Sequence, residues 1–231
     1  MAFAVLFSAL GIGLASSGIV KFSRYDQKAV RQSLKPMLEE KRIPLGAPLF
    51  IRIFKKTAEL EVWMKDEAGQ WQLFQNYPIC YFSGNLGPKL KEGDLQSPEG
   101  FYRVSKSQMN PKSSYHLSFN LGYPNRFDRA NGRTGSYLMV HGNCVSIGCY
   151  AMTDEKIEEI YTLASAAFKG GQKTFQVHVF PFRMGEENMQ EHAGSKWADF
   201  WQNLKQGYDF FEENKRLPKI TVSDKRYKIR P

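Results

Sequence analysis

A histidine and a cysteine, His141 and Cys149, lie eight residues apart in a segment whose pattern suits chemistry. His141 follows a short apolar run, 137–140, that has the length and composition of a buried strand. Cys149 comes shortly before a predicted helix, which Thr153 can cap. A nearby imidazole and a helix N-terminus both stabilise a thiolate, the nucleophilic form of cysteine. The pattern is therefore compatible with a cysteine nucleophile, although a free cysteine is also often buried and inert.

The residues just before this cysteine suit acyl transfer. Gly148 lets the backbone turn tightly, so the amides around Cys149 can converge on one point. A negative charge develops on oxygen during acyl transfer, and convergent amides stabilise it. A zinc site formed by His141, Cys144 and Cys149 is disfavoured, because the spacing is neither Cys-x-x-Cys nor His-x-x-x-His. We therefore predict no metal and no other cofactor.

The order His-Gly followed by Ser-x-Gly-Cys resembles the signature of the YkuD-type L,D-transpeptidases, and segment 141–154 resembles their YafK-like branch. The similarity extends from about Pro48 nearly to the C-terminus. Its further matching strings are 83–89, 97–102, 123–125 and 132–135. Members of this family are bacterial cell-wall enzymes with a cysteine nucleophile, so the resemblance implies that chemistry here.

The resemblance assigns roles by motif position. It implies that Cys149 is the nucleophile and His141 the general base, and that Ser146 shapes the loop between them. The amides of Gly148 and Cys149 match the positions that face the developing oxyanion. The chain departs from the wider pattern at Ile147, where many members have a second histidine. It departs again at Ala151, where many have an arginine, so the way a substrate carboxylate is held is left open.

Substrate-binding residues are expected beside the base and in the stretch 105–136, which we predict to be a long, loop-rich excursion. The candidates are Gly142, Tyr115, Tyr123, Asn125 and Arg133. Long loops on a rigid scaffold often carry function, but the same side chains could equally tie the loop down. We interpret the two remaining strand histidines, His116 and His178, as structural.

The organisation of the chain predicts an exported protein. Residues 1–17 are typical of a secretory signal peptide, although no Lys or Arg precedes their apolar run. Residues 18–47 form a helical lead-in, and 48–231 form the catalytic domain. We therefore expect the periplasm or cell envelope, with membrane contact only if the first segment is not cleaved. In an oxidising compartment Cys80 and Cys144 could pair, which leaves Cys149 as the odd cysteine of three.

The predicted fold class is mainly β with accessory helices (α+β), a sandwich or barrel with the cysteine at a strand-loop-helix junction. Short strands are predicted at 49–54, 59–64, 71–74, 77–82, 101–104 and 174–180, with an irregular stretch at 83–100. The run between 49 and 82 is expected to pair antiparallel. A helix follows Thr153 and ends at Gly170. An aromatic stripe over 197–211 predicts a packed helix, and a last strand at 219–222 precedes a basic tail.

Charge and the resemblance together define the expected partners. The formal net charge is +9, which favours anionic partners. No nucleic-acid motif is present, and we predict no nucleic-acid partner. Peptidoglycan stems carry free carboxylates and fit a basic surface. The resemblance implies acyl transfer from a tetrapeptide stem to another stem or to a lysine of an envelope protein. Two alternatives stay open: a hydrolase that trims stems or releases wall-linked protein, and a non-catalytic peptidoglycan-binding module.

Overall fold

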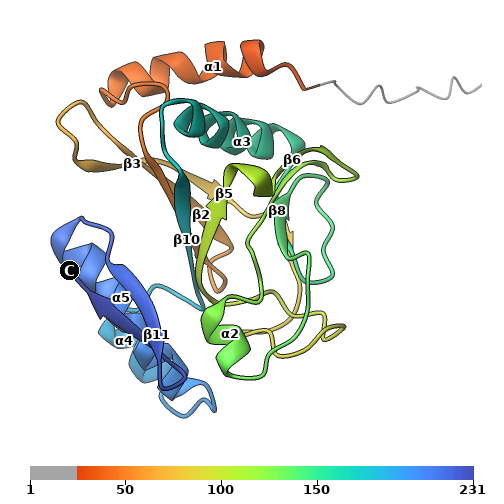
Figure 1. The fold of residues 1–231 in the computed structure, drawn as a ribbon, viewed down its shortest axis with the longest axis vertical. Helices are drawn as coiled ribbons and strands as arrows, with labels where there is room; N and C mark the ends of the chain where they lie inside the picture. The colour runs from red at the N-terminus through yellow and green to blue at the C-terminus, as the bar shows by residue number, and fades with distance from the viewer. Residues whose placement is uncertain (1–24) are drawn as a thin grey trace, which may run out of the picture.

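The computed structural model describes residues 25–231. The predicted signal peptide, 1–17, and the start of the lead-in, 18–24, lie outside the described residues. Two five-stranded sheets with helices on their outer faces make up most of the described chain (Figure 1). This architecture confirms the predicted α+β class with a large β component.

The first sheet has the strand order β3-β2-β1-β10-β5. Its strands are β1 (Leu49–Phe54), β2 (Glu59–Lys65), β3 (Trp71–Pro78), β5 (Gly100–Ser105) and β10 (Thr174–Phe180). Strand β10 inserts between β1 and β5 and runs parallel to β1. A parallel neighbour needs a crossover connection, and the long chain between β1 and β10 supplies it.

Strand β1 is buried along its whole length because both faces of the sheet are covered. Ile51 and Ile53 join a core with the helix α3 (Asp154–Lys169). On the opposite face, Phe50 packs against Phe211 of the helix α5 (Ala198–Asn214), with ring centroids 5.0 Å apart. The aromatic stripe of α5 is therefore packing, as predicted.

The second sheet, β4-β9-β8-β7-β6, carries the two candidate catalytic residues. Its strands are β4 (Tyr81–Phe82), β6 (Met109–Ser113), β7 (His116–Asn120), β8 (Met139–His141) and β9 (Tyr150–Ala151). The prediction that 105–136 is loop-rich was thus wrong in part. This stretch forms β6, β7, a 3-10 turn (Lys106–Gln108) and the short helix α2 (Arg126–Ala130). Pro111 hides the β6 signal, since proline is tolerated on an edge strand but is rare in strands generally.

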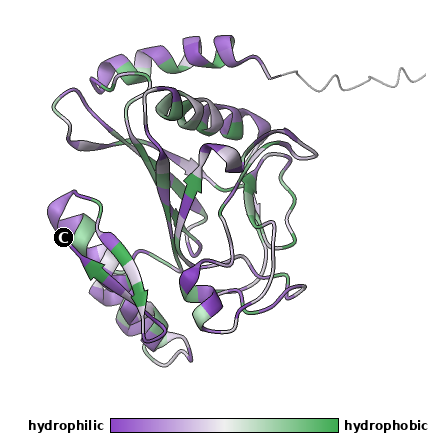
Figure 2. Ribbon diagram, viewed as in Figure 1, coloured by the Kyte–Doolittle hydropathy of each residue, from purple (hydrophilic) through white to green (hydrophobic). Residues whose placement is uncertain are grey.

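Two helices cover one face of the sheets. Helix α1 (Gln27–Glu40), in the predicted lead-in, begins at Asp26, whose carboxylate accepts from the amides of Lys28 and Ala29. It buries Leu34 and Leu38 against the same core as α3. Figure 2 shows the outward faces of α1 and α3 as hydrophilic. Among residues 25–231, no helix has the length and apolar character needed to cross a bilayer.

The C-terminal segment packs on the other side of the first sheet. It comprises α4 (Glu186–Glu191), α5 and a hairpin of β11 (Lys219–Ser223) and β12 (Arg226–Arg230). The predicted basic tail is therefore a strand. The turn residues Asp224 and Lys225 both have positive φ, 53° and 58°, as a two-residue I′ hairpin turn requires. The sequence lacks the usual Asn-Gly at this turn, so the hairpin signal is weak.

Candidate active site

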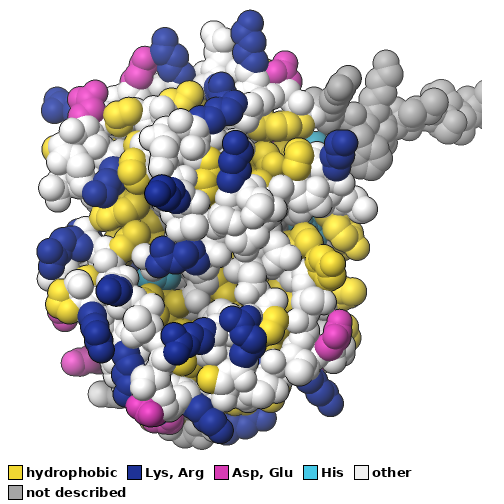
Figure 3. All heavy atoms as spheres, in the orientation of Figure 1, with side chains coloured by type: hydrophobic (Ala, Val, Ile, Leu, Met, Phe, Trp, Pro, Cys, Tyr) yellow, Lys and Arg dark blue, Asp and Glu magenta, His cyan; other side chains and the backbone are white. Residues whose placement is uncertain are grey.

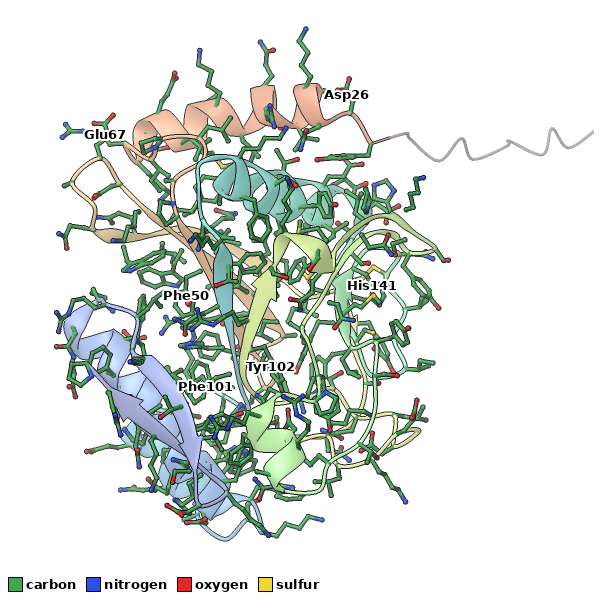
Figure 4. The ribbon with its side chains drawn as sticks, viewed as in Figure 1. Asp26, Phe50, Glu67, Phe101, Tyr102 and His141 are labelled. Atoms are coloured by element: carbon green, nitrogen blue, oxygen red, sulfur yellow. A yellow bond between two sulfur atoms is a disulfide. The ribbon has the colours of Figure 1, made fainter. Side chains whose placement is uncertain are left out.

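Parallel pairing of β8 with β9 brings the histidine and the cysteine together. The register sets His141 opposite Ala151 and Val140 opposite Tyr150. Paired residues point to the same face of a sheet, and side chains alternate along a strand. Cys149, two residues before Ala151, is therefore on the same face as His141. The Met139 amide lies 3.4 Å from the Cys149 Sγ and donates to it, which fixes the sulfur beside β8. Figure 4 labels His141 in this sheet.

His141 is held as a neutral base. Its Nδ1 lies 2.6 Å from the carbonyl oxygen of Gly142. A carbonyl can only accept, so Nδ1 carries the proton and Nε2 keeps a lone pair. Burial lowers the pKa of His141, and the bond to Gly142 opposes this only in part. The Tyr115 ring packs on the imidazole with centroids 4.7 Å apart. The resting imidazole is therefore uncharged, with Nε2 available to take a proton.

Cys149 is a free, partly buried thiol. Burial raises its pKa, and two features oppose the rise: the amide of Met139 and the positive charge of Lys89. The Sγ also lies 3.6 Å from the carbonyl of Tyr137, to which the thiol donates. The resting sulfur is therefore a thiol, and reaction requires a base to remove its proton.

Serine side chains fold the loop that precedes the cysteine. The Ser146 hydroxyl donates to the carbonyl of Cys149 at 2.8 Å and accepts from the amide of Gly148 at 3.1 Å. The Ser97 hydroxyl donates to the same Cys149 carbonyl at 2.9 Å. The Gly148 amide, expected to face an oxyanion, is thus committed inside the loop. Within residues 25–231 no acceptor engages the Cys149 amide, which leaves it for an incoming oxygen.

A buried ion pair holds the irregular stretch 83–100, which carries Ser97, against the end of β1. Lys55 of the turn after β1 pairs with Glu99 at 3.2 Å, and both side chains are fully buried. The Lys55 ammonium also donates to three backbone carbonyls, including that of Ser97 at 3.1 Å. Burial lowers the pKa of Lys55, and the charge of Glu99 opposes this. Sequence reasoning missed the contributions of Lys55 and Ser97, because both depend on contacts distant along the chain.

A disulfide closes the other end of the catalytic loop. Cys80 and Cys144 are bonded, with Cα atoms 5.3 Å apart, which confirms the predicted pairing. Cys144 lies between His141 and Cys149 in the sequence. Because its sulfur is bonded to Cys80, it cannot act as a thiolate nucleophile. The bond ties the loop to the residue before β4.

The expected substrate-binding residues fall into two groups. Tyr115 lies on His141, and the Gly142 amide donates to the carbonyl of Tyr115 at 3.1 Å, so this pair belongs to the site. The three others have internal partners. The Tyr123 hydroxyl donates to the carbonyl of Lys89, Asn125 caps α2, and Arg133 pairs with Asp128 at 2.9 Å. The structure does not join these three to the His141–Cys149 pair.

The two other strand histidines have structural surroundings. His116 pairs with Glu158 of α3 at 2.7 Å and anchors the β6–β7 hairpin tip that carries Tyr115. His178 is fully buried among aromatic rings of the first sheet and α5.

Comparison with known proteins identifies the family of the chain. The family model for the YkuD L,D-transpeptidase catalytic domain matches residues 50–179. A protein of Escherichia coli (strain K12) named "Putative L,D-transpeptidase YafK" is 47% identical over 191 residues, which cover 83% of this chain and 77% of that protein. The protein of the same name from Escherichia coli O157:H7 matches equally.

A solved structure was also compared. The helical cell shape determining protein Pgp2 from Campylobacter jejuni superposes with a TM-score of 0.48 and 21% identity, covering 87% of this chain and 82% of that one. The family match and the curated relatives suffice: this chain belongs to the YkuD family of L,D-transpeptidase catalytic domains, in a YafK-like branch.

Proposed function

We propose that this chain is a cysteine-dependent L,D-transpeptidase that acts on peptidoglycan tetrapeptide stems. The observation that carries the proposal is the placement of a free thiol, Cys149, and a neutral imidazole, His141, on one face of the sheet at the β8–β9 pair. Membership of the family supports the substrate class. The peptide stems lie in the cell wall, so we place the enzyme in the periplasm or cell envelope.

The first half-reaction forms a thioester. His141 Nε2 takes the proton of the Cys149 thiol as the sulfur attacks the carbonyl at the L,D-peptide junction of the stem. The carbonyl oxygen gains negative charge, and the free Cys149 amide donates to it. The C–N bond then breaks, and His141 returns the proton to the departing amine of D-alanine. Ser146 and Ser97 hold the Cys149 carbonyl and so keep the amide oriented.

The second half-reaction transfers the acyl group. An amine attacks the thioester, His141 takes its proton, and the sulfur leaves to recover the thiol. The amine comes from a neighbouring stem, giving a crosslink, or from a lysine of an envelope protein. If water attacks instead, the same thioester gives a shortened stem.

Two measurements test the proposal. A carbapenem acylates a cysteine nucleophile of this kind, so intact-mass analysis should show one adduct on the native chain and none on Cys149→Ala. Incubation with purified muropeptides should then give crosslinked or protein-linked stems. Shortened stems alone would replace the transferase with a hydrolase. A folded native chain without an adduct would indicate a non-catalytic binding module.

A further inference from the structure

A cleft away from the catalytic residues is lined by arginines and lacks acids. It measures about 320 Å³ and lies between the edge strand β5, the helix α2 and the hairpin strand β11. Arg103, Arg126 and Arg129 line it, and no Asp or Glu does. No carboxylate within residues 25–231 forms a salt bridge with any of the three. Arg129 donates to the backbone carbonyl of Pro124, but no carboxylate neutralises the charge of any of the three guanidinium groups, which can therefore attract an external anion.

The rest of the cleft lining suits a small peptide. Phe101, Leu121 and Tyr227 form a buried apolar floor. Gln176 lies directly across the strand pair from Arg103, so an amide side chain stands beside a guanidinium. Arg103 itself donates to Thr174 at 3.2 Å, which orients it along the sheet surface. A guanidinium binds a carboxylate through two parallel hydrogen bonds, so the cleft combines anion donors with an apolar floor.

The charge extends over the whole surrounding face. Figure 3 views the side that carries β11 and α2, and it shows Lys and Arg side chains spread over this side with acids mainly at its margins. The large exposed hydrophobic side chains of the described chain do not include any residue of the cleft. A membrane-binding surface presents apolar groups that enter the lipid, whereas here the apolar groups are recessed. The surroundings therefore favour a carboxylate-bearing polymer over a lipid headgroup.

We propose that this arginine cleft is a second, non-catalytic binding site for the carboxylates of a peptidoglycan peptide stem. The identity of the ligand rests on the proposed function, since that function defines the polymer that the enzyme meets. The cleft shares no residue with the His141–Cys149 pair. A stem held there tethers the enzyme to the wall and raises the local concentration of other stems at Cys149.

Sedimentation with purified sacculi tests the cleft. The nucleophile variant Cys149→Ala is the parent, so that no covalent bond contributes. Reversing two charges, Arg126→Glu with Arg129→Glu, should weaken binding at least about tenfold, because charge-assisted hydrogen bonds are lost. The matched control reverses two lysines on the exposed face of α1, Lys28→Glu with Lys35→Glu, and should bind nearly as the parent does. Equal losses in both double variants would overturn a specific cleft in favour of net charge.

Two further arms identify the ligand and separate the two proposals. With sacculi whose carboxylates have been amidated, the parent and the arginine variant should bind equally. A difference in binding that persists would refute carboxylate recognition. Vesicles containing phosphatidylglycerol should bind both proteins equally weakly, and a selective loss of vesicle binding by the arginine variant would assign the cleft to lipid. Carbapenem acylation of the chain with Cys149 intact should be the same with and without the arginine changes. Absence of acylation in both would reject the proposed catalysis and leave the sacculus measurement as an independent result.

Discussion

Two polar regions of this molecule contain similar side chains but use them differently. The catalytic edge comprises His141, Ser146 and Cys149, and the Asp128 cluster comprises Tyr102, Asn125, Asp128 and Arg133. In the Asp128 cluster the carboxylate accepts from the Asn125 amide, from the Arg133 guanidinium and from the Tyr102 hydroxyl. Its polar groups are paired with one another.

The catalytic edge instead keeps two groups uncommitted. His141 Nε2 and the Cys149 amide have no partner within residues 25–231, while the groups around them are tightly bonded. The Asp128 cluster therefore acts as scaffold, whereas the catalytic edge keeps a ring lone pair and a backbone donor available for a substrate.

The largest expected effect comes from removing the reacting groups. Cys149→Ala should abolish carbapenem acylation, because no other side chain of the site supplies a nucleophile. His141→Gln should slow acylation by about 10²–10⁴, the usual contribution of a general base. Both variants should unfold at nearly the native temperature, since neither breaks an ion pair. Rapid acylation of a folded Cys149→Ala chain would show that the nucleophile lies elsewhere.

The Asp128 cluster should respond in the opposite way. Arg133→Met leaves the buried Asp128 carboxylate without its ion-pair partner, and such losses cost about 3–5 kcal/mol in unfolding free energy. Denaturant titration measures this loss, and the folded fraction should still be acylated at the native rate. Lys35→Met is the control, because its exposed pair with Glu39 contributes only about 0.5 kcal/mol. A folded Arg133→Met chain that cannot be acylated would return Arg133 to the substrate-binding group.

The disulfide gives a smaller effect on stability. It closes a separation of 64 residues, and a native disulfide of this kind contributes about 2–4 kcal/mol. Cys80→Ser with Cys144→Ser should lower the unfolding free energy by that amount, while Cys149 still forms its adduct. Thiol counting of the denatured native chain should give one free thiol. Loss of the adduct in the folded double variant would mean that the tether is needed to keep the catalytic loop in place.

The sequence predicts the helices and strands better than the contacts that hold the site residues in place. β1, β10 and α3 are recovered within a residue or so because their periodicity, caps and burial are local properties. β12 was missed because Asp224–Lys225 is an unusual I′ turn. At the site, the motif predicts Cys149 and His141 as the reacting residues. It cannot reveal the Ser97 hydroxyl on the Cys149 carbonyl, a contact between residues 52 apart in the chain.

The candidate substrate residues show the same limit. Tyr115, Asn125 and Arg133 lie in one polar, aromatic stretch. Their residue types make each an equally plausible substrate-binding residue. The fold separates them, because the β6–β7 hairpin carries Tyr115 onto His141 while α2 turns Asn125 and Arg133 toward Asp128. Side-chain direction at such positions depends on tertiary packing, which a single sequence does not encode locally.

The pH dependence of acylation should show whether His141 and Cys149 rest as a neutral imidazole and a thiol or as a charged pair. Burial lowers the pKa of His141 below its ordinary value and raises that of Cys149, so the pair rests as imidazole and thiol. Acidification inactivates the enzyme by protonating His141 Nε2. The native rate should therefore stay on its plateau below the usual histidine pKa of about 6.5 and fall only at lower pH.

The variant His141→Gln provides the comparison. Without a base it must react through the thiolate, so its rate should rise about tenfold per pH unit until the pH passes the Cys149 pKa, above the ordinary value of about 8.5. Stopped-flow acylation by a carbapenem measures both profiles. A range from about pH 4 to about pH 10 covers the titration of a histidine and of a cysteine. A native rate that already falls on acidification above about pH 6.5 would show that the pKa of His141 is not lowered, and a pH-independent variant would mean that the thiol is ionised without His141.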